Sequence, residues 1–171
     1  ARLLFPEYVE ELEDLSPAHI FQRRIHGAGY SYRQCFDGAA LNFRQYDRAL
    51  SELAERHDFA IAARVAVRRL AAPFALSDSA RADYLAVLRE HGGPLACALA
   101  KQGDSVSLHV LLSLSVLSDA GIDAACTAAR KRRAAASMSS AAKMAETAAL
   151  SVLLAAAGPS KPRGREKTFD L

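Results

Sequence analysis

Apolar stretches that end in a small-residue turn recur along the middle of this chain, and this recurrence most limits the folds that it can adopt. Three such stretches cover residues 48–58, 81–93 and 109–121, and each leads into an alanine-rich helical pattern. Their turns are spaced by about 34 and then about 29 residues, within the range of helical-hairpin repeats. A repeat of this kind buries its apolar face only against its neighbours. The pattern therefore predicts a stacked scaffold for binding rather than a catalytic pocket.

The composition favours helices that approach one another closely. The hydrophobic fraction is 51%, much of it alanine, and the 171 residues include no tryptophan. Alanine has the highest helix propensity, and no alternating β-branched run between turns predicts a strand. The length allows one domain with a continuous core. We predict an all-α fold, a short right-handed solenoid of antiparallel helix hairpins with no sheet.

Three regions are expected along the chain. Residues 1–40 are predicted to form N-terminal helices and a connector that cap the stack, residues 41–157 the helical-hairpin repeat domain, and residues 158–171 a basic C-terminal tail. In the first region an acidic stretch favours a helix over residues 6–15. Ser16 followed by proline favours a second helix that ends near His26. The tail is expected to be disordered alone and to become ordered on a partner.

Turn and cap residues predict the helix boundaries within the repeat domain. The pair Gly92 and Gly93 is expected to end a helix that Ser77 or Asp78 caps, and Asp104 or Ser105 is expected to cap a strongly apolar helix that runs to about residue 118. Ser139 or Ser140 is expected to cap the last helix. Leu114 to alanine is expected to cost about 2–5 kcal/mol if Leu114 is tightly packed. The predicted core contains Leu50, Leu53, Val65, Leu85, Leu88, Leu111, Leu114, Leu117 and Leu153.

The residues that carry chemistry in enzymes and metal sites are scattered here. No phosphate-binding loop, nucleophile elbow or metal-ligand spacing occurs, so we expect no catalytic residues, no cofactor and no metal, and a protein that is not itself an enzyme. The cysteines lie among small or apolar residues, which favours buried reduced thiols in a reducing compartment. The histidines are His19, His26, His57, His91 and His109, and the cysteines are Cys35, Cys97 and Cys126.

Basic residues near the C-terminal end are the candidate contacts with a partner. The net charge is only +3, too little by itself to indicate nucleic acid. The local cluster at 130–133 fits either a solvated helix face or a contact with an acidic partner or a phosphate backbone. No apolar run reaches the ~18 residues that a membrane span needs. The candidate partner-binding residues are Arg130, Lys131, Arg132, Arg133, Phe169 and Leu171.

Residues 109–140 resemble a pentatricopeptide repeat. A first helix leads to Asp119-Ala120-Gly121, and a longer second helix opens at Ile122. Residues 41–78 resemble a longer, degenerate copy and residues 79–105 a shortened one. Residues 92–106 followed by an apolar helix also resemble an armadillo unit, so both ancestries stay open. Either resemblance implies a right-handed helical stack.

The repeat number, mass and helix order are also similar to those of the eighteen-kilodalton accessory subunits on the catalytic head of euglenozoan-type mitochondrial ATP synthases. That resemblance implies a non-catalytic chain in the mitochondrial matrix, bound to an α subunit. A start at Ala1 fits a processed import sequence, and equally methionine removal or a chosen boundary. The alternative is a small organellar RNA-binding pentatricopeptide-like protein. It ranks second because such proteins read RNA with many tandem repeats, and a cytoplasmic location also stays open.

Overall fold

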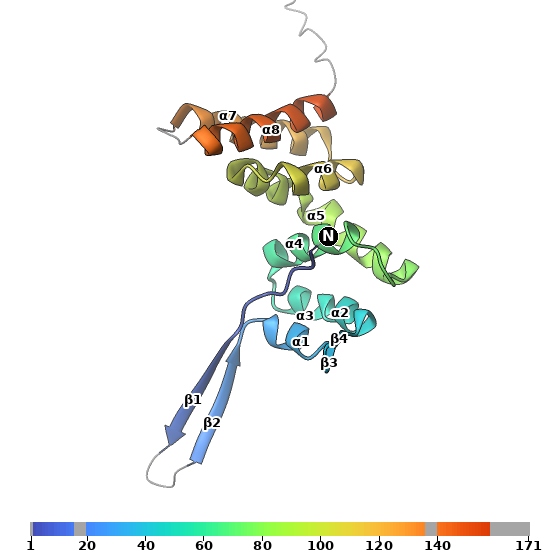
Figure 1. Ribbon diagram of the computed structural model, residues 1–171, viewed down its shortest axis with the longest axis vertical. Helices are drawn as coiled ribbons and strands as arrows, with labels where there is room; N and C mark the ends of the chain where they lie inside the picture. Colours follow the sequence, from blue (N-terminus) through green and yellow to red (C-terminus); the bar gives the residue numbers. More distant parts are fainter. Residues whose placement is uncertain (1, 16–19, 136–139, 158–171) are drawn as a thin grey trace, which may run out of the picture.

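Helices form most of the computed structural model, which describes residues 2–15, 20–135 and 140–157 (Figure 1). The helices are α1 (Gly29–Arg33), α2 (Phe43–Arg48), α3 (Leu50–Glu55), α4 (Phe59–Leu70), α5 (Asp78–Gln102), α6 (Ser105–Ser113), α7 (Asp119–Ala135) and α8 (Ser140–Ala157). The strands are β1 (Val9–Leu15), β2 (Ile20–His26), β3 (Phe36–Asp37) and β4 (Ala40–Leu41). The predicted helical class is confirmed in this coarse form.

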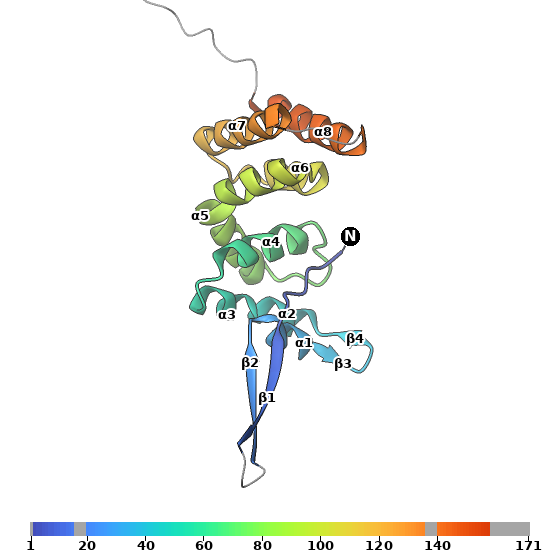
Figure 2. The same cartoon turned by 90° about the vertical axis from the view of Figure 1, so that its left-hand side faces the viewer.

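The helices lie in successive layers along the long axis of the molecule (Figures 1 and 2). Helices α1 to α3 form the layer at one end, α4 and α5 follow, and α6, α7 and α8 complete the other end. Helix α5 connects the layers, because it packs extensively on both α4 and α7. The strands β1 and β2 extend beyond the first layer.

The expectation of a fold with no sheet was wrong. Strands β1 and β2 pair as an antiparallel hairpin, and β3 and β4 form a second, much shorter one. The helices predicted over residues 6–15 and from Ser16 to His26 were wrong, because residues 9–15 and 20–26 are strands, and residues 16–19 lie outside the described part of the chain. Val9, Leu12 and Leu15 have helical spacing, but a helix of about ten residues is marginal in water without tertiary packing. Pairing the two stretches with each other satisfies the backbone groups along their shared edge instead.

The helix end predicted at Gly92 and Gly93 was also wrong. Helix α5 runs through both glycines and through Pro94, and it ends at Gly103 in the left-handed conformation with φ 74°. A Cβ added at Gly92 would lie 3.0 Å from Leu117 Cδ2, and one at Gly93 would lie 4.0 Å from the Gly121 Cα. These glycines therefore allow neighbouring chain to approach the helix closely. The hairpin predicted over residues 79–105 is one long helix.

The cap residues agree with the sequence patterns more closely. Ser77 caps α5 by accepting a hydrogen bond from the Ala80 backbone nitrogen, and Asp104 caps α6 by accepting one from the Ser107 nitrogen at 3.0 Å. Such caps satisfy backbone donors that the first helical turn leaves unpaired. Helix α6 ends at Ser113, several residues before the predicted end. The chain has left the helix by Ser115, where φ is +52°.

Two thirds of the predicted core residues are buried. Leu50, Leu53, Val65, Leu88, Leu111 and Leu153 are buried, whereas Leu85, Leu114 and Leu117 are partly buried and pack against the core. Helices α5 and α7, which pack against each other, also contribute fully buried alanines to the core, namely Ala96, Ala100, Ala125 and Ala129. Small side chains let the two helix backbones approach, as the alanine-rich composition predicts.

We expect Leu111 to alanine to lower the free energy of unfolding by about 2–5 kcal/mol, because the side chain is fully buried. Leu114 to alanine should cost less, because Leu114 lies at the end of α6 and is only partly buried. Urea unfolding of the two variants measures the difference. Equal costs would contradict the burial assigned to these two positions.

A buried ion pair holds α2, α4 and α5 together. The Arg69 side chain is 0% exposed and the Asp47 side chain is 7% exposed. Arg69 donates from Nε to Asp47 Oδ1 at 2.7 Å and from Nη2 to Oδ2 at 3.1 Å, and its Nη1 donates to the Ala72 carbonyl at 2.6 Å. The Tyr84 hydroxyl donates to Asp47 Oδ1 at 2.9 Å. The guanidinium, the carboxylate and the tyrosine hydroxyl of this cluster therefore all form hydrogen bonds.

Candidate functional site: the hairpin arm

The antiparallel pair of β1 and β2, here called the hairpin arm (residues 9–15 and 20–26), is exposed over most of the side chains that the structure describes. It projects away from the helical layers in both views (Figures 1 and 2). Its register pairs Val9 with His26 at the base. The side chains of Val9 and Leu12 are 58% and 68% exposed. Among the described residues this sheet has only two strands, so both outer edges lack a strand partner.

An aromatic and ionic cluster fixes the base of the arm. Arg23 Nε lies 2.6 Å from Glu10 Oε1, and the Arg23 guanidinium lies 5.4 Å from the centre of the Tyr30 ring. The Tyr8 ring meets Tyr30 edge to face with a centroid distance of 5.7 Å. The hydrogen bond to Glu10 is the main cause of a raised Arg23 pKa. The pair is exposed, so it orients the arm more than it stabilises the fold.

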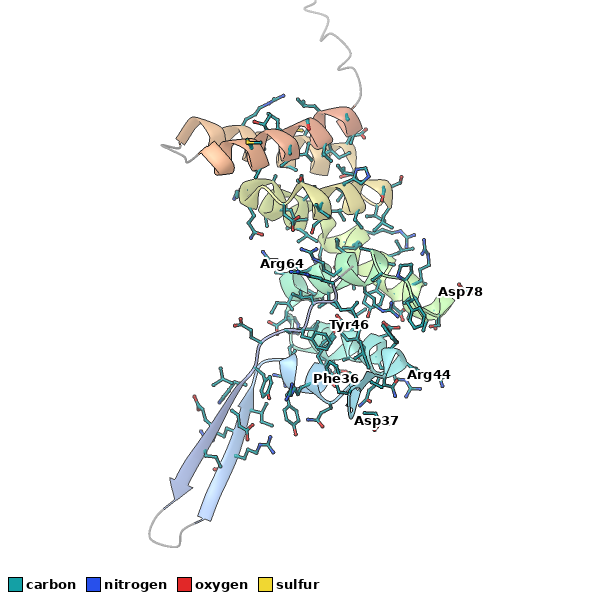
Figure 3. The ribbon with its side chains drawn as sticks, in the orientation of Figure 1. Phe36, Asp37, Arg44, Tyr46, Arg64 and Asp78 are labelled. Atoms are coloured by element: carbon teal, nitrogen blue, oxygen red, sulfur yellow. The ribbon has the colours of Figure 1, made fainter. Side chains whose placement is uncertain are left out.

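The extended residues before the arm are fastened to the first helical layer. The Phe5 ring stacks on Phe36 at 5.3 Å and meets Tyr46 edge to face at 5.4 Å. Phe36 and Tyr46 lie in this layer beside the start of the arm (Figure 3). The Tyr46 hydroxyl donates to the Leu4 carbonyl at 2.5 Å, and the Gly29 nitrogen donates to the Glu7 carbonyl at 3.3 Å. The residues that precede the arm are therefore packed against the helical body and hydrogen-bonded to it.

The charge of the arm differs from that of the rest of the chain. The arm contains four carboxylates and two arginines, although the whole chain carries a net charge of +3. Glu11 also approaches His26, with Oε2 3.4 Å from Nε2. An excess of negative charge repels a phosphate backbone and attracts a basic protein surface. The arm is therefore better suited to a protein partner than to nucleic acid.

The residues predicted to bind a partner lie elsewhere. Arg130 and Lys131 are exposed on α7, in the layers far from the arm. Arg132 and Arg133 lie within α7, but their side chains are outside the described part of the structure. Phe169, Leu171 and the whole predicted tail are outside the described residues. The structure does not bring the basic cluster and the arm together, so the two are separate candidate surfaces.

The three cysteines are free thiols that lie wholly or partly inside the fold. Cys35 and Cys126 are buried and Cys97 is partly buried, all three free. Burial raises the pKa of Cys35 to about 11, with smaller contributions from the Glu52 and Asp47 charges, so this thiol is a poor nucleophile at neutral pH. Residues 2–15, 20–135 and 140–157 contain no grouping of histidine, cysteine and carboxylate side chains suited to a metal ion.

The described helices also include none that combines the length and apolar character needed to cross a bilayer. Comparisons of the chain with protein-family models, with curated proteins and with solved structures found no match. The pentatricopeptide-like and armadillo-like resemblances therefore stay predictions.

Sequence reasoning missed the arm, although one signal was present. In the sequence an acidic stretch of seven residues precedes Ser16-Pro17 and a stretch with two arginines follows, and their apolar ends are Val9, Leu15 and Ile20. Opposite charges on two adjacent short stretches favour pairing across a hairpin. The helical spacing of the leucines concealed this signal.

Proposed function

We propose that this chain is a non-catalytic accessory subunit of a larger protein assembly, attached to its host through the hairpin arm. The exposed arm is the observation that carries the proposal. A two-stranded hairpin is marginally stable by itself in water, and an unpaired strand edge is a template for another strand. Strand addition at such an edge is a common mode of protein recognition. An arm with open edges and a held base is suited to that use.

The host that we propose is a mitochondrial assembly, with the α subunit on the catalytic head of ATP synthase as the specific contact. The similarity in mass, at 18.4 kDa, supports this choice. Nucleotide chemistry would then belong to the host. The layers from α4 to α8 would act as a short right-handed solenoid, pentatricopeptide-like or armadillo-like, that presents the arm at one end. A basic surface on the host would match the acidic excess of the arm.

A variant that lacks most of the hairpin arm tests this proposal. Replacing residues 10–25 by Asn-Gly joins Val9 to His26, which face each other across the hairpin, with a turn suited to a two-residue connection. We expect the affinity-tagged variant to fold but to lose at least tenfold of its recovery of host subunits. Native purification followed by mass spectrometry measures that recovery, and head subunits of ATP synthase should dominate the wild-type sample.

A second variant separates the protein host from RNA. Replacing Arg130 and Lys131 by alanine removes exposed positive charge without touching the arm. This variant should keep the host if the arm makes the attachment. If the chain binds RNA, the basic variant should lose its partner and the wild-type affinity should fall steeply with salt, because phosphate contacts release counterions. Host recovery that survives removal of the arm would contradict the proposed attachment.

A further inference from the structure

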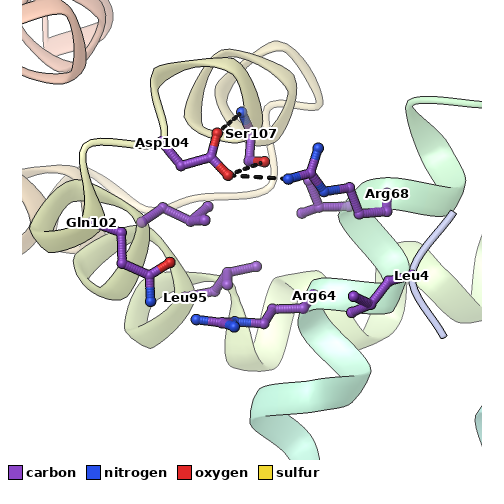
Figure 4. A pocket seen from close by; sticks show the side chains of 9 residues that line it. Leu4, Arg64, Arg68, Leu95, Gln102, Asp104 and Ser107 are labelled. Carbon is purple, nitrogen blue, oxygen red and sulfur yellow. Dashed lines mark hydrogen bonds and ion pairs between the residues drawn. The ribbon is translucent and has the colours of Figure 1, made fainter. Parts of the chain in front are cut away.

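A small pocket lies between α4, α5 and α6, and the extended residues before the arm border it (Figure 4). Its volume is about 110 Å³, and its lining includes Leu4, Arg64, Arg68, Leu95, Leu99 and Gln102. One water molecule occupies about 30 Å³ of liquid, so the pocket has room for an organic group of a few heavy atoms. The lining combines charged and polar side chains with leucines, which suits a ligand with one polar and one apolar end.

The two arginines of the pocket are in different electrostatic situations. Arg68 Nη2 lies 3.2 Å from Asp104 Oδ2, and Asp104 also accepts hydrogen bonds from the Ser107 nitrogen and hydroxyl. Arg64 lies one turn earlier on α4, and among the described residues it has no ion-pair or hydrogen-bond partner. The three charged groups leave a net positive charge in the pocket, located on Arg64.

Asp104 stays charged at neutral pH. Burial by itself would raise its pKa, but the hydrogen bonds from Ser107 and the positive charges of Arg68 and Arg64 lower it. The carboxylate therefore keeps Arg68 engaged and also caps α6. Arg64 remains the group available to an incoming anion.

The remaining walls restrict what that anion can be. The Arg64 and Gln102 side chains extend toward the same side of the pocket (Figure 4), and both carry N–H donors. Leucine side chains supply the apolar wall, which disfavours a strongly hydrated dianion such as phosphate. The nearby Asp104 carboxylate acts in the same direction, because it repels a second negative charge.

We propose that this pocket binds a short aliphatic carboxylate, with its oxygens on Arg64 and Gln102 and its alkyl part against Leu4, Leu95 and Leu99. The volume of about 110 Å³ accommodates an alkyl part of a few carbon atoms. The group has two sources, a free short-chain acid or the side chain of a glutamate on another protein. The proposal is independent of the accessory-subunit function, since none of its residues belongs to the arm.

Titration of the full-length chain with butanoate, followed by NMR of the leucine methyl groups, tests this assignment. We expect saturable shifts at Leu4, Leu95 and Leu99, with a dissociation constant on the order of millimolar, as the few atoms of such a ligand allow. Arg64→Gln should weaken binding at least tenfold. Arg89→Gln is the matched control, because Arg89 is exposed on α5 and does not line the pocket. Arg64→Lys should retain part of the binding.

Butanol and butylammonium have the same alkyl chain without the carboxylate, and they should give no saturable shift at the same methyl groups. N-acetylglutamate amide separates the two sources. If N-acetylglutamate amide binds at least as tightly as butanoate, the ligand is a glutamate side chain. If butanoate binds and N-acetylglutamate amide does not, the ligand is a free acid. Equal responses to butanoate and butanol, no saturable response to butanoate, or butanoate binding that survives Arg64→Gln would overturn the proposal.

Discussion

Replacing Asp47 with alanine should lower the free energy of unfolding by about 3–5 kcal/mol, because it leaves a buried guanidinium without its counter-charge. Arg69 is fully buried, and its remaining hydrogen bond to the Ala72 carbonyl supplies only a partial charge. The Tyr84 hydroxyl loses its acceptor in the same variant. Chemical unfolding of the wild type and the variant, followed by circular dichroism, measures the effect.

Asp83→Ala provides the matched control for charge. Asp83 is exposed on α5, and its replacement removes the same charge without opening the buried cluster, so we expect less than about 0.5 kcal/mol. The double variant Asp47→Leu with Arg69→Met should be more stable than Asp47→Ala, because it removes both buried charges together. A cost for Asp47→Ala close to that of Asp83→Ala would show that the ion pair contributes little to the fold.

Replacing Gly29 with alanine should detach the residues before the arm from the helical body. A Cβ at this position would lie 2.1 Å from the Pro6 carbonyl oxygen and 2.7 Å from the Glu7 carbonyl carbon. Both neighbours are backbone atoms, so they cannot move aside by changing a rotamer. We expect the free energy of unfolding to fall by about 1–3 kcal/mol or more. The amide of residue 29, which donates to the Glu7 carbonyl in the wild type, should exchange its hydrogen faster in the variant.

The control for this variant is Gly93→Ala. Gly93 lies inside α5, and a Cβ there would meet its nearest neighbour, Gly121 Cα, at 4.0 Å. Alanine stabilises a helix interior by roughly 0.5–1 kcal/mol relative to glycine. The Gly93→Ala variant should therefore be as stable as the wild type or more stable. If Gly29→Ala left both stability and the residue 29 amide exchange unchanged, the close contact between residue 29 and the segment before the arm would be contradicted.

Local sequence patterns identified the helical body, because each pattern depends on residues that are close together in the sequence. Ser77 and Asp104 were named as possible caps, and both accept the expected hydrogen bonds from the following helical turn. Leu50, Leu53 and Val65 were placed in the core from helical periodicity alone, and all are buried. Capping and periodicity depend on neighbours within about four residues, so one sequence is sufficient to read them.

The glycines of this chain show why local rules failed elsewhere. The sequence analysis interpreted Gly92 and Gly93 as a helix end. In the structure this pair lies inside α5, where neighbouring chain approaches, and Gly29 makes room for the Pro6 backbone. A glycine that ends a helix and a glycine that allows a close contact cannot be distinguished in the sequence. Only the partner across the contact, many residues away, distinguishes them.

The sequence by itself determined that this chain is mainly helical, since alanine content and periodic leucines act locally. The tertiary structure alone decided that residues 9–15 and 20–26 form an arm, because Glu10 and Arg23 form their ion pair only once the two stretches are side by side. It also decided that Asp47, Arg69 and Tyr84 form one buried cluster and that Arg64 borders a pocket with Gln102. Those pairs are distant in sequence, and their energies depend on a burial that no local pattern encodes.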